Sequence, residues 1–448
     1  MKNFPNDFIW GAASSSYQIE GGFDADGKGP SIWDTFSHTK GKVIHEQNGN
    51  IACNHYYDYK KDVALLKELG IPCYRFSISW PRIFPNGDNM LNEKGLQFYD
   101  NLIDELLMYG IIPYVTLYHW DLPQPLEDKG GWTNREIISA FADYAAFVTK
   151  HFSDRVTYFF TINEPQCIAS LGYGNGIHAP GKTLPDIEVL KVFHHLALAH
   201  GNAVKAMRAV AKQPIKIGFA STGNLCFPQT QTEADINCAR QLSFAITEEN
   251  WRFSHSLFSD GIILGKYPDV SHLFGEGPYP FIEDGDLEQM SQPIDFYAVN
   301  VYNGHEVSAT FPGHFIPKYD GFPRTALKWP ITPGVMNWGM RFLYERYHLP
   351  LIVSENGLSC NDKVFLDGSV HDLDRIDFLD RYLTELCDAA SSDAKILGYF
   401  HWSLTDNFEW HNGYDDRFGI IYVDFRDQSR LIKDSGHWYS NVIKDNAI

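Results

Sequence analysis

Two segments of the sequence place a glutamate beside an asparagine directly after an apolar run. Residues 158–165 read YFFTINEP and residues 350–357 read PLIVSENG, so Glu164 and Glu355 each follow a run with strand character. Strand interiors disfavour asparagine and glutamate, and proline cannot continue a central strand. Each segment is therefore either a plain strand end that turns into a loop or a strand end that presents a carboxylate to a ligand. Two such carboxylates facing each other could transfer protons to and from a bound molecule.

Apolar or β-rich runs recur along the chain and alternate with segments of helical periodicity. Residues 55–70 and 95–110 predict helices that stop at Gly70 and Gly110, and Thr133 is predicted to cap a third, with Glu136 completing a capping box. Near-continuously apolar strands covered by helices are typical of a parallel sheet. The runs number eight and span residues 7–14, 73–80, 112–120, 158–165, 215–222, 294–302, 350–357 and 396–404.

Eight strand–helix repeats predict a (β/α)8 TIM barrel with elaborated βα loops. Although 448 residues could form two or three domains, a large barrel can contain them all, and we expect one catalytic domain over residues 1–448. A doubly wound sheet is the alternative. It would be expected to carry a glycine-rich phosphate loop after its first strand, and the segment WGAASSSYQIEGG lacks that pattern.

Polar and aromatic side chains gather at the carboxyl ends of the predicted strands. In a (β/α)8 barrel these ends converge at one mouth, where active sites lie. Glu164 on the fourth run and Glu355 on the seventh would face each other across it. The other candidates at this mouth are Gln18, Arg75, His119, Asn163, Asn300, Tyr302 and Trp402.

Charge and cysteine usage exclude several classes of partner. The net charge of −19 makes nucleic acid and anionic membranes poor partners. The seven cysteines are scattered and include no Cys-x-x-Cys, which favours reduced thiols over a disulfide framework or a zinc site. The N-terminal residues do not resemble a signal peptide, and no apolar run reaches membrane-spanning length. We therefore expect a cytoplasmic protein with a small-molecule partner, and a homo-oligomer remains open.

Aromatic residues make up 15% of the chain and often stand beside polar ones, as in YHWDLP, HWSLTDNFEW and GHWYS. A ring-rich core would explain the number alone. Rings interleaved with hydrogen-bonding groups also suit a surface that stacks on something flat and hydroxylated, such as a sugar face.

Taken together, these motifs resemble those of glycoside hydrolase family 1, the β-glucosidase family. TINEP and VSENG are similar to the two carboxylate signatures of that family. The segments DFIWGAASSSYQIEGG, YRFSISWPRIFP, LYHWDLPQPLEDKGGW, GIHAPG and WSLTDNFEW…GYDDRFGIIYVDF follow in the family's order. The resemblance extends from about residue 4 to about residue 440.

The resemblance implies hydrolysis of β-glycosides with retention of configuration, with Glu164 as general acid/base and Glu355 as nucleophile. Retaining hydrolysis needs two carboxyl groups about 5–5.5 Å apart, one to attack the anomeric carbon and one to protonate the leaving oxygen. The resemblance also implies that Arg75, Asn300 and the Tyr302 hydroxyl lie near the nucleophile, and that Trp329 lies on the aglycone side. It assigns the sugar hydroxyls and the sugar ring to Gln18, His119, Asn163, Trp402, Glu409 and Trp410.

The segment NFEWHNGYDDRFG bears on the choice of substrate. Relatives that act on 6-phosphosugars usually carry a serine near Glu409, followed by a lysine and a tyrosine, whereas this chain has Glu409, Asp416 and Phe418. Carboxylates there would repel a phosphate dianion. We expect unphosphorylated β-glucosides, either cellobiose-like or with aryl or alkyl aglycones, with β-galactosides or β-fucosides as side substrates. A 6-phospho-β-glucosidase and a non-catalytic sugar-binding barrel remain the alternatives.

Some positions depart from the family pattern: Val301, Ser354, His411 and the segment TALKW at 325–329. None of them removes a catalytic group, but together they leave the leaving-group preference open. The histidines of FHHLALAH, residues 193–200, lack the His-Glu-x-x-His spacing of a zinc site and predict a helix beside the barrel. No metal or cofactor is expected.

Overall fold

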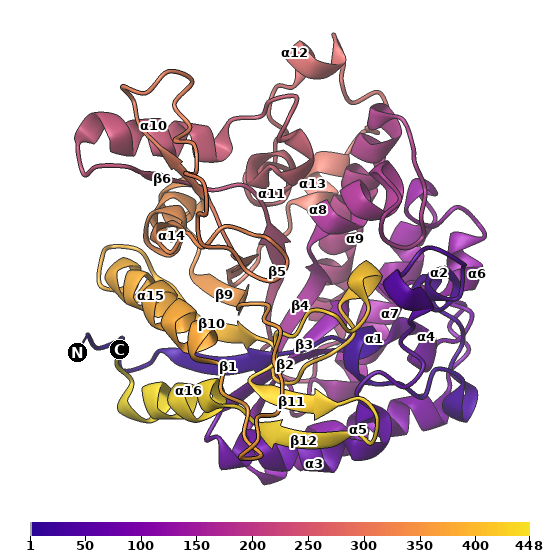
Figure 1. The fold of residues 1–448 in the computed structure, drawn as a ribbon. Helices are drawn as coiled ribbons and strands as arrows, with labels where there is room; N and C mark the ends of the chain where they lie inside the picture. Colours follow the sequence, from indigo (N-terminus) through magenta and orange to yellow (C-terminus); the bar gives the residue numbers. More distant parts are fainter. Residues whose placement is uncertain (1) are drawn as a thin grey trace.

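A closed barrel of parallel strands forms the centre of the molecule. The structure is a computed structural model and describes residues 2–448 (Figure 1). The strand order around the barrel is β1-β10-β9-β7-β5-β4-β3-β2, with every pair parallel. The strands are β1 (Ile9–Ala13), β2 (Cys73–Ser77), β3 (Ile112–Tyr118), β4 (Tyr158–Asn163), β5 (Lys216–Thr222), β7 (Tyr297–Asn300), β9 (Leu351–Asn356) and β10 (Ile396–Trp402). Each lies within one of the eight predicted runs, so the predicted (β/α)8 barrel is confirmed.

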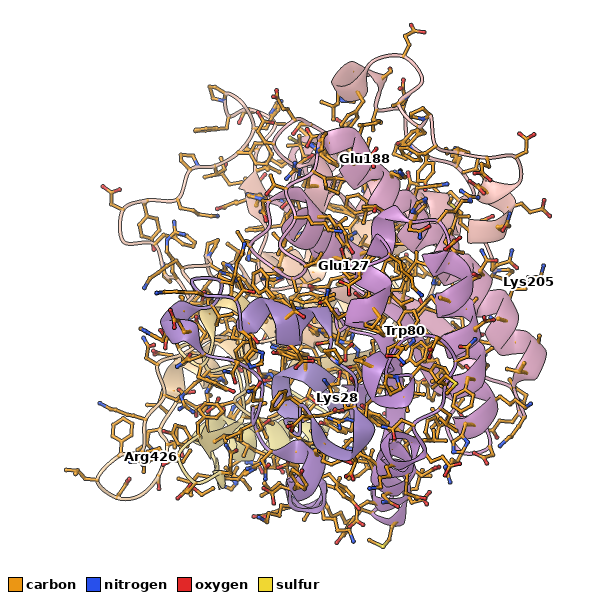
Figure 2. All side chains as sticks on the ribbon, turned by 90° about the vertical axis from the view of Figure 1, so that its right-hand side faces the viewer. Lys28, Trp80, Glu127, Glu188, Lys205 and Arg426 are labelled. Atoms are coloured by element: carbon orange, nitrogen blue, oxygen red, sulfur yellow. The ribbon has the colours of Figure 1, made fainter. Side chains whose placement is uncertain are left out.

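Helices cover the outside of this barrel (Figure 1). The longer ones are α3 (His55–Glu68), α5 (Glu93–Met108), α7 (Ile137–Phe152), α9 (Asp186–Val210), α10 (Glu233–Phe244), α11 (His255–Ile263), α14 (Gly334–Tyr347), α15 (Leu373–Ala390) and α16 (Asp434–Asp445). Lys205 of α9 projects outward at the edge of the molecule, while Trp80, in the connection after β2, is fully buried (Figure 2).

Shorter elements fill the connections. The short helices are α1 (Ser16–Ile19), α2 (Ile32–Ser37), α4 (Trp80–Ile83), α6 (Gln124–Glu127), α8 (Pro165–Cys167), α12 (Ser271–Phe274) and α13 (Asp286–Met290). Single 3-10 turns lie at η1 (Ala25–Gly27), η2 (Ile44–Glu46), η3 (Gly131–Thr133), η5 (Trp251–Phe253) and η6 (Trp410–Asn412), and η4 (Ile168–Gly174) is a short π-helix. Two small sheets pair β6 (Cys226–Pro228) with β8 (His305–Val307) and β11 (Ile421–Asp424) with β12 (Ser429–Ile432).

The helix boundaries test the sequence predictions. Gly70 and Gly110 follow α3 and α5 with φ of 66° and 73°, the left-handed geometry that ends a helix and favours glycine. The predicted cap at Thr133 is wrong. The Thr133 hydroxyl donates to the Gly130 carbonyl at 2.7 Å, whereas the Asn134 side chain accepts the backbone N–H of Glu136 at 3.0 Å. Thr133 is instead part of the turn η3, which anchors the buried Trp132.

The predicted helix that carries the histidine cluster is α9, and each of its three histidines has a hydrogen-bond partner inside the protein. His194 faces Asp286 at 2.8 Å, His195 faces the Trp132 carbonyl at 2.9 Å, and His200 faces the Thr161 hydroxyl at 2.7 Å. Among residues 2–448 no group of three or more His, Cys, Asp and Glu side chains could hold a metal ion. Within the same residues, no helix has both the length and the apolar character to cross a membrane.

The inside of the barrel is packed by side chains from all eight strands. This cluster comprises Ala13, Cys73, Tyr114, Phe160, Ala220, Phe296, Ala298, Ile352, Phe400, Trp402 and Phe418. Its rings make close pairs; Tyr114 and Tyr158, for example, stack with centroids 4.3 Å apart. A solid interior fixes the strand ends relative to one another, so the side chains at the carboxyl ends are held in defined positions.

Candidate active site

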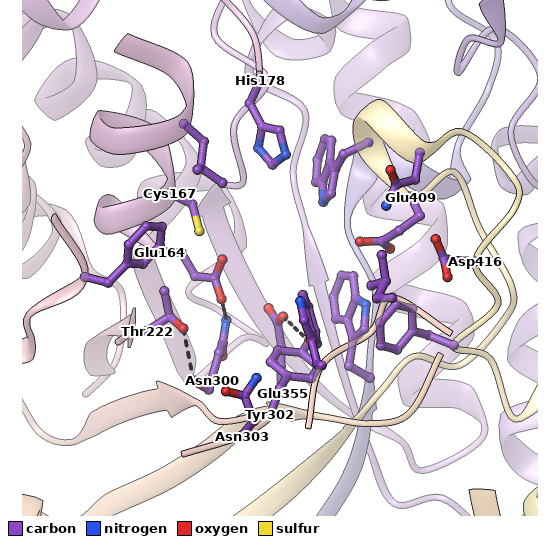
Figure 3. Close-up of a pocket in the computed structure, with 18 of the residues that line it drawn as sticks. Glu164, Cys167, His178, Thr222, Asn300, Tyr302, Asn303, Glu355, Glu409 and Asp416 are labelled. Carbon is purple, nitrogen blue, oxygen red and sulfur yellow. Dashed lines mark hydrogen bonds between the residues drawn. The ribbon is translucent and has the colours of Figure 1, made fainter. Parts of the chain in front are cut away.

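A cavity of about 710 Å³ opens at the carboxyl ends of the strands, and both glutamates line it (Figure 3). Glu164 and Glu355 are only 7% and 4% exposed, so each carboxyl group is largely shielded from bulk water. Aromatic and polar side chains complete the wall: His119, Trp120, Asn300, Tyr302, Asn303, Trp329, Trp402, Glu409, Trp410 and Phe418. A concave site with an aromatic wall and converging polar groups suits a polyhydroxylated ligand.

Glu355 lies in β9, and its carboxylate has two strong donors. The Arg75 guanidinium donates to Oε1 at 2.7 Å, and the Tyr302 hydroxyl donates to Oε2 at 2.9 Å. Gly357 allows the strand to reach this position, because a Cβ there would lie 1.8 Å from the Trp402 carbonyl oxygen. A cation and a hydroxyl on the same carboxylate favour its ionised form.

Glu164 follows the last residue of β4 in an unusual backbone conformation. Its φ is +47°, in the left-handed region that residues other than glycine rarely adopt. The backbone is held there by an N–H that donates to the Ala220 carbonyl at 2.8 Å, and Pro165 begins α8 at once. Trp120 and Trp410 on the same wall also have positive φ, 79° and 50°. Strained residues that cluster in one cavity are a feature of functional sites.

A continuous hydrogen-bonded network joins the two carboxyl groups. Arg75 contacts Glu355 and also donates to Asn163 Oδ1 at 2.7 Å. Asn300 Nδ2 donates to the same Asn163 oxygen at 3.2 Å and to Glu164 Oε1 at 2.9 Å. The two glutamates are therefore positioned by shared partners, and a change at either one is felt by the other.

The surroundings of the two carboxyl groups give them different proton affinities. Burial, and then the charge of Glu355, raise the pKa of Glu164 to about 7. Burial also raises the pKa of Glu355, but Arg75, Tyr302 and Asn300 oppose that shift. Near neutral pH the site can therefore hold one protonated and one ionised carboxyl group, as an acid paired with a nucleophile requires.

The aromatic part of the wall is a stacked set of rings. His119 lies between Trp402 and Trp410, with ring centroids 5.7 and 5.9 Å away and interplanar angles of 20° and 19°. Beside them, Gln18 donates to Glu409 at 3.4 Å. Burial, and then Asp416, raise the pKa of Glu409 well above its ordinary value. This wall combines flat apolar surface with hydrogen-bonding groups, which matches a sugar ring and its hydroxyls.

Comparison with known proteins decides the family. The sequence profile of glycosyl hydrolase family 1 matches residues 1–448. The chain belongs to glycosyl hydrolase family 1. It is 43% identical to a 1,4-β-D-glucan glucohydrolase of Thermotoga neapolitana over all of both chains. It is 39% identical to an aryl-phospho-β-D-glucosidase of Bacillus subtilis, over 100% of this chain and 98% of that one.

The same comparison confirms the fold. A β-glucosidase from Thermotoga maritima in complex with glucoimidazole superposes with a TM-score of 0.91 at 42% identity, over all of both chains. The protein is thus a family 1 glycoside hydrolase whose full-length homologues include β-glucosidases. Which glycosides it cleaves does not follow from family membership, because relatives at about this identity act on both free and phosphorylated glucosides.

Not all of the predicted family 1 residues reach the cavity wall. His119, Glu164, Asn300, Tyr302, Trp329, Glu355, Trp402, Glu409 and Trp410 line it. Gln18, Arg75 and Asn163 do not, and each is at most 1% exposed. Gln18 Nε2 donates to the Phe408 carbonyl at 2.9 Å, and Asn163 Nδ2 lies 3.0 Å from His119 Nε2. The geometry thus places these three directly behind the wall, where they orient Glu409, His119 and Glu355.

Several residues on the wall are not predicted from the sequence. Cys167 lies three residues after Glu164. Thr222 is the last residue of β5, so it lies at the carboxyl end of a barrel strand, as Glu355 does in β9. His178 lies on the wall and belongs to the GIHAPG motif, from which the sequence predicts no role for it. Thr222 could be predicted, because side chains at the carboxyl ends of barrel strands meet at the mouth of the barrel. Cys167 and His178 lie in the segment after β4, and the positions of the strands do not predict where that segment lies.

Two departures from the family pattern have a structural account. Ser354 keeps a hydroxyl that donates to Asn300 Oδ1 at 2.7 Å, which turns the Asn300 amide nitrogen toward Glu164. Val301 is 3% exposed and is not among the residues that line the cavity, and its backbone carbonyl accepts from Asn356 at 2.7 Å. Lys328 has a φ of 67° and lies on the cavity wall beside Trp329.

Proposed function

We propose that the protein hydrolyses the β-glycosidic bond of unphosphorylated β-glucosides with retention of configuration. In the first step the Glu355 carboxylate attacks the anomeric carbon while Glu164 gives its proton to the leaving oxygen, which produces a glycosyl-enzyme ester and a free aglycone. In the second step Glu164, now ionised, removes a proton from water, which attacks the same carbon and releases glucose and the Glu355 carboxylate. The difference between the surroundings of the two buried carboxyl groups carries this proposal.

The role of each neighbour follows from its contacts. Arg75 and Tyr302 hold both oxygens of Glu355, so they orient the nucleophile and favour its anion. Asn300 orients Glu164 through one amide hydrogen bond. We propose that His119, Trp402, Glu409 and Trp410 bind the sugar itself, with Gln18 and Asn163 supporting that wall, and that Trp329 contacts the aglycone.

The assignment of the nucleophile can be tested by trapping. The protein would be incubated with an activated 2-deoxy-2-fluoro-β-glucoside, digested, and mapped by mass spectrometry. The fluorine slows both steps, so an ester should accumulate on the peptide that contains Glu355. An ester on any other residue would contradict the assignment, and no ester on folded protein would contradict covalent catalysis of an unphosphorylated glucoside.

The pH dependence of kcat/KM should be bell-shaped. Glu164 must be protonated to act as an acid, so activity should fall as the pH rises through about 7, approaching tenfold per pH unit. Glu355 must be ionised, so activity should fall again as the pH drops through the pKa of Glu355, which burial raises above its ordinary value. Initial rates with an aryl β-glucoside from pH 4 to 9 test this expectation. A flat profile would contradict the assigned acid and base.

Preference for an unphosphorylated sugar is proposed from the charges on the wall. Glu164, Glu355, Glu409 and Asp416 all line the cavity, and within residues 2–448 Lys328 is the single lysine or arginine that does so. A phosphate dianion would meet four carboxyl groups and one cation. We expect kcat/KM for 4-nitrophenyl β-glucoside to exceed that for its 6-phosphate by at least about 100-fold. Equal or reversed values would favour the 6-phospho-β-glucosidase alternative.

Three further expectations remain proposals. We propose that residues 1–448 form a single catalytic domain, that the protein acts in the cytoplasm, and that it needs no cofactor. A homo-oligomer is compatible with these and is settled by light scattering. β-Galactosides and β-fucosides are proposed as side substrates, to be ranked by kcat/KM against the glucoside.

A further inference from the structure

One pair of side chains on the cavity wall has no part in the chemistry proposed above. His178, from the segment after β4, and His411, in η6, both line the cavity, and Nε2 of His178 lies 3.2 Å from Nδ1 of His411. In Figure 3 the ring of His178 points toward the space above Glu164. His411 is one of the positions where this sequence departs from the family pattern, so the pair is a feature of this chain rather than of the reaction.

The surroundings of His178 decide which nitrogen carries its proton. Its Nδ1 is buried and has no hydrogen-bond partner within residues 2–448. The rings around it are Trp33, Trp120 and Trp410, with centroids 5.3, 5.4 and 6.3 Å away. Indole nitrogen can only donate, so none of these rings offers an acceptor atom for an N–H at Nδ1. The proton therefore belongs on Nε2, which donates it to His411, and burial that lowers the pKa of His178 to about 3 keeps the ring neutral.

The state of His411 follows from that of His178. Because Nδ1 of His411 accepts the hydrogen bond, the neutral ring carries its own proton on Nε2. Within residues 2–448 no protein group pairs with this Nε2, and it is not among the buried polar atoms that lack a partner, so it is accessible to a ligand. Burial lowers the pKa of His411, which favours the same neutral form.

The position of His411 along the depth of the cavity indicates what it would meet. Trp402 and Glu355 on the floor are 3% and 4% exposed, and Ile177, next to His178 on the same wall, is 43% exposed. His411 is half-buried, between floor and rim. A donor there would meet the outer part of a bound glucoside rather than its reacting carbon.

We propose that His411 is a specificity-determining residue whose Nε2–H, directed by His178, donates a hydrogen bond to a sugar oxygen outside the reacting centre. The oxygen belongs either to an outer hydroxyl of the cleaved glucose unit or to the second sugar of a disaccharide. The inference rests on the proposed function, because it takes a β-glucoside as the occupant of the cavity.

The first test compares two substitutions at one position. His411→Phe keeps a ring and removes the donor, whereas His411→Gln keeps an N–H donor. KM for cellobiose should rise about three- to tenfold in H411F with little change in kcat, and H411Q should recover most of that loss. His437→Phe, at an exposed position of α16, is the matched control for a histidine-to-phenylalanine change and should leave every constant unchanged.

Free glucose and 4-nitrophenyl β-glucoside show whether the sugar oxygen belongs to the cleaved glucose unit or to the second sugar. If it belongs to the cleaved unit, H411F should also raise the inhibition constant of free glucose and KM for 4-nitrophenyl β-glucoside. If it belongs to the second sugar, only cellobiose should be affected. The proposal is overturned if all three constants in H411F stay within about twofold of the unsubstituted protein, or if H411Q is as impaired as H411F.

The second test does not depend on turnover. In protein labelled with ¹⁵N-histidine, both rings should be neutral at pH 7 with the proton on Nε2, and H411F and H178F would assign the signals. A proton on Nδ1 of His178 would overturn the directed donor. Failure of the proposed function would appear differently, as an absence of β-glucoside hydrolysis by the unsubstituted protein.

Discussion

Replacing Glu355 with glutamine is expected to lower kcat for an aryl β-glucoside by on the order of 10⁴-fold or more, with the fold intact. The amide cannot form the ester intermediate, and it cannot supply the negative charge that a developing oxocarbenium ion needs. A 10⁴-fold loss corresponds to about 5.4 kcal/mol of transition-state stabilisation. Steady-state kinetics measures the loss, and circular dichroism establishes that the variant is folded.

Replacing Glu355 with the smaller alanine tests whether the group that is lost is the nucleophile. In Glu355→Ala the missing carboxylate leaves room for an external anion, so azide should restore turnover of an activated β-glucoside. The product should be the α-glucosyl azide, because a single displacement from the face of the missing nucleophile inverts the anomeric centre. A β-azide, or a loss of less than about tenfold in E355Q, would show that Glu355 does not attack the sugar.

Substitutions of the residues that contact Glu355 should lower kcat less than substitution of Glu355 itself. Tyr302→Phe removes one of two donors to Glu355 and leaves the Arg75 contact in place. We expect kcat to fall by about 10- to 100-fold, since one hydrogen bond to a charged group contributes about 1.5–3 kcal/mol. The acid limb of the pH profile should move upward, because the phenolic hydroxyl lowers the pKa of Glu355. An unchanged acid limb would contradict that role.

The barrel could be predicted from the sequence because its signals are local. Each strand is a short apolar run, and each helix that ends at Gly70 or Gly110 shows its own stop residue. The small sheets could not be predicted in this way. β6 pairs with β8, which lies 77 or more residues further along the chain and beyond β7, so nothing in either three-residue segment specifies the partner.

The two glutamates stood out because they break a local rule, that strands exclude carboxylates and amides. Cys167 and His178 on the same wall carry no such local signal, since they lie in the segment after β4, which only tertiary packing brings to the cavity. Sequence alone also could not show that Gln18 and Asn163 lie behind the wall rather than on it. Whether a polar side chain contacts the ligand or supports a residue that does depends on packing around it, here on the Phe408 carbonyl and on His119.

Replacing Glu164 with alanine should give a loss that depends on the leaving group. With cellobiose, whose leaving alcohol needs a proton, kcat/KM should fall by about 10²- to 10⁴-fold, the usual contribution of a general acid. With 2,4-dinitrophenyl β-glucoside the first step needs no proton and should continue, so the ester on Glu355 should accumulate because no base activates water. A rapid burst of dinitrophenol followed by slow turnover is the expected time course.

The configuration of the azide product distinguishes Glu164→Ala from Glu355→Ala. In Glu164→Ala the anion would replace the carboxylate on the opposite side of the cavity and attack the glycosyl ester, giving the β-glucosyl azide. The basic limb of the pH profile of kcat/KM, near 7 in the unsubstituted protein with the aryl β-glucoside used above, should disappear with that substrate, because the group responsible for it is gone. Glu188→Gln on the outer face of α9 is the control and should keep both limbs (Figure 2). Equal losses with both leaving groups would show that Glu164 is not the acid.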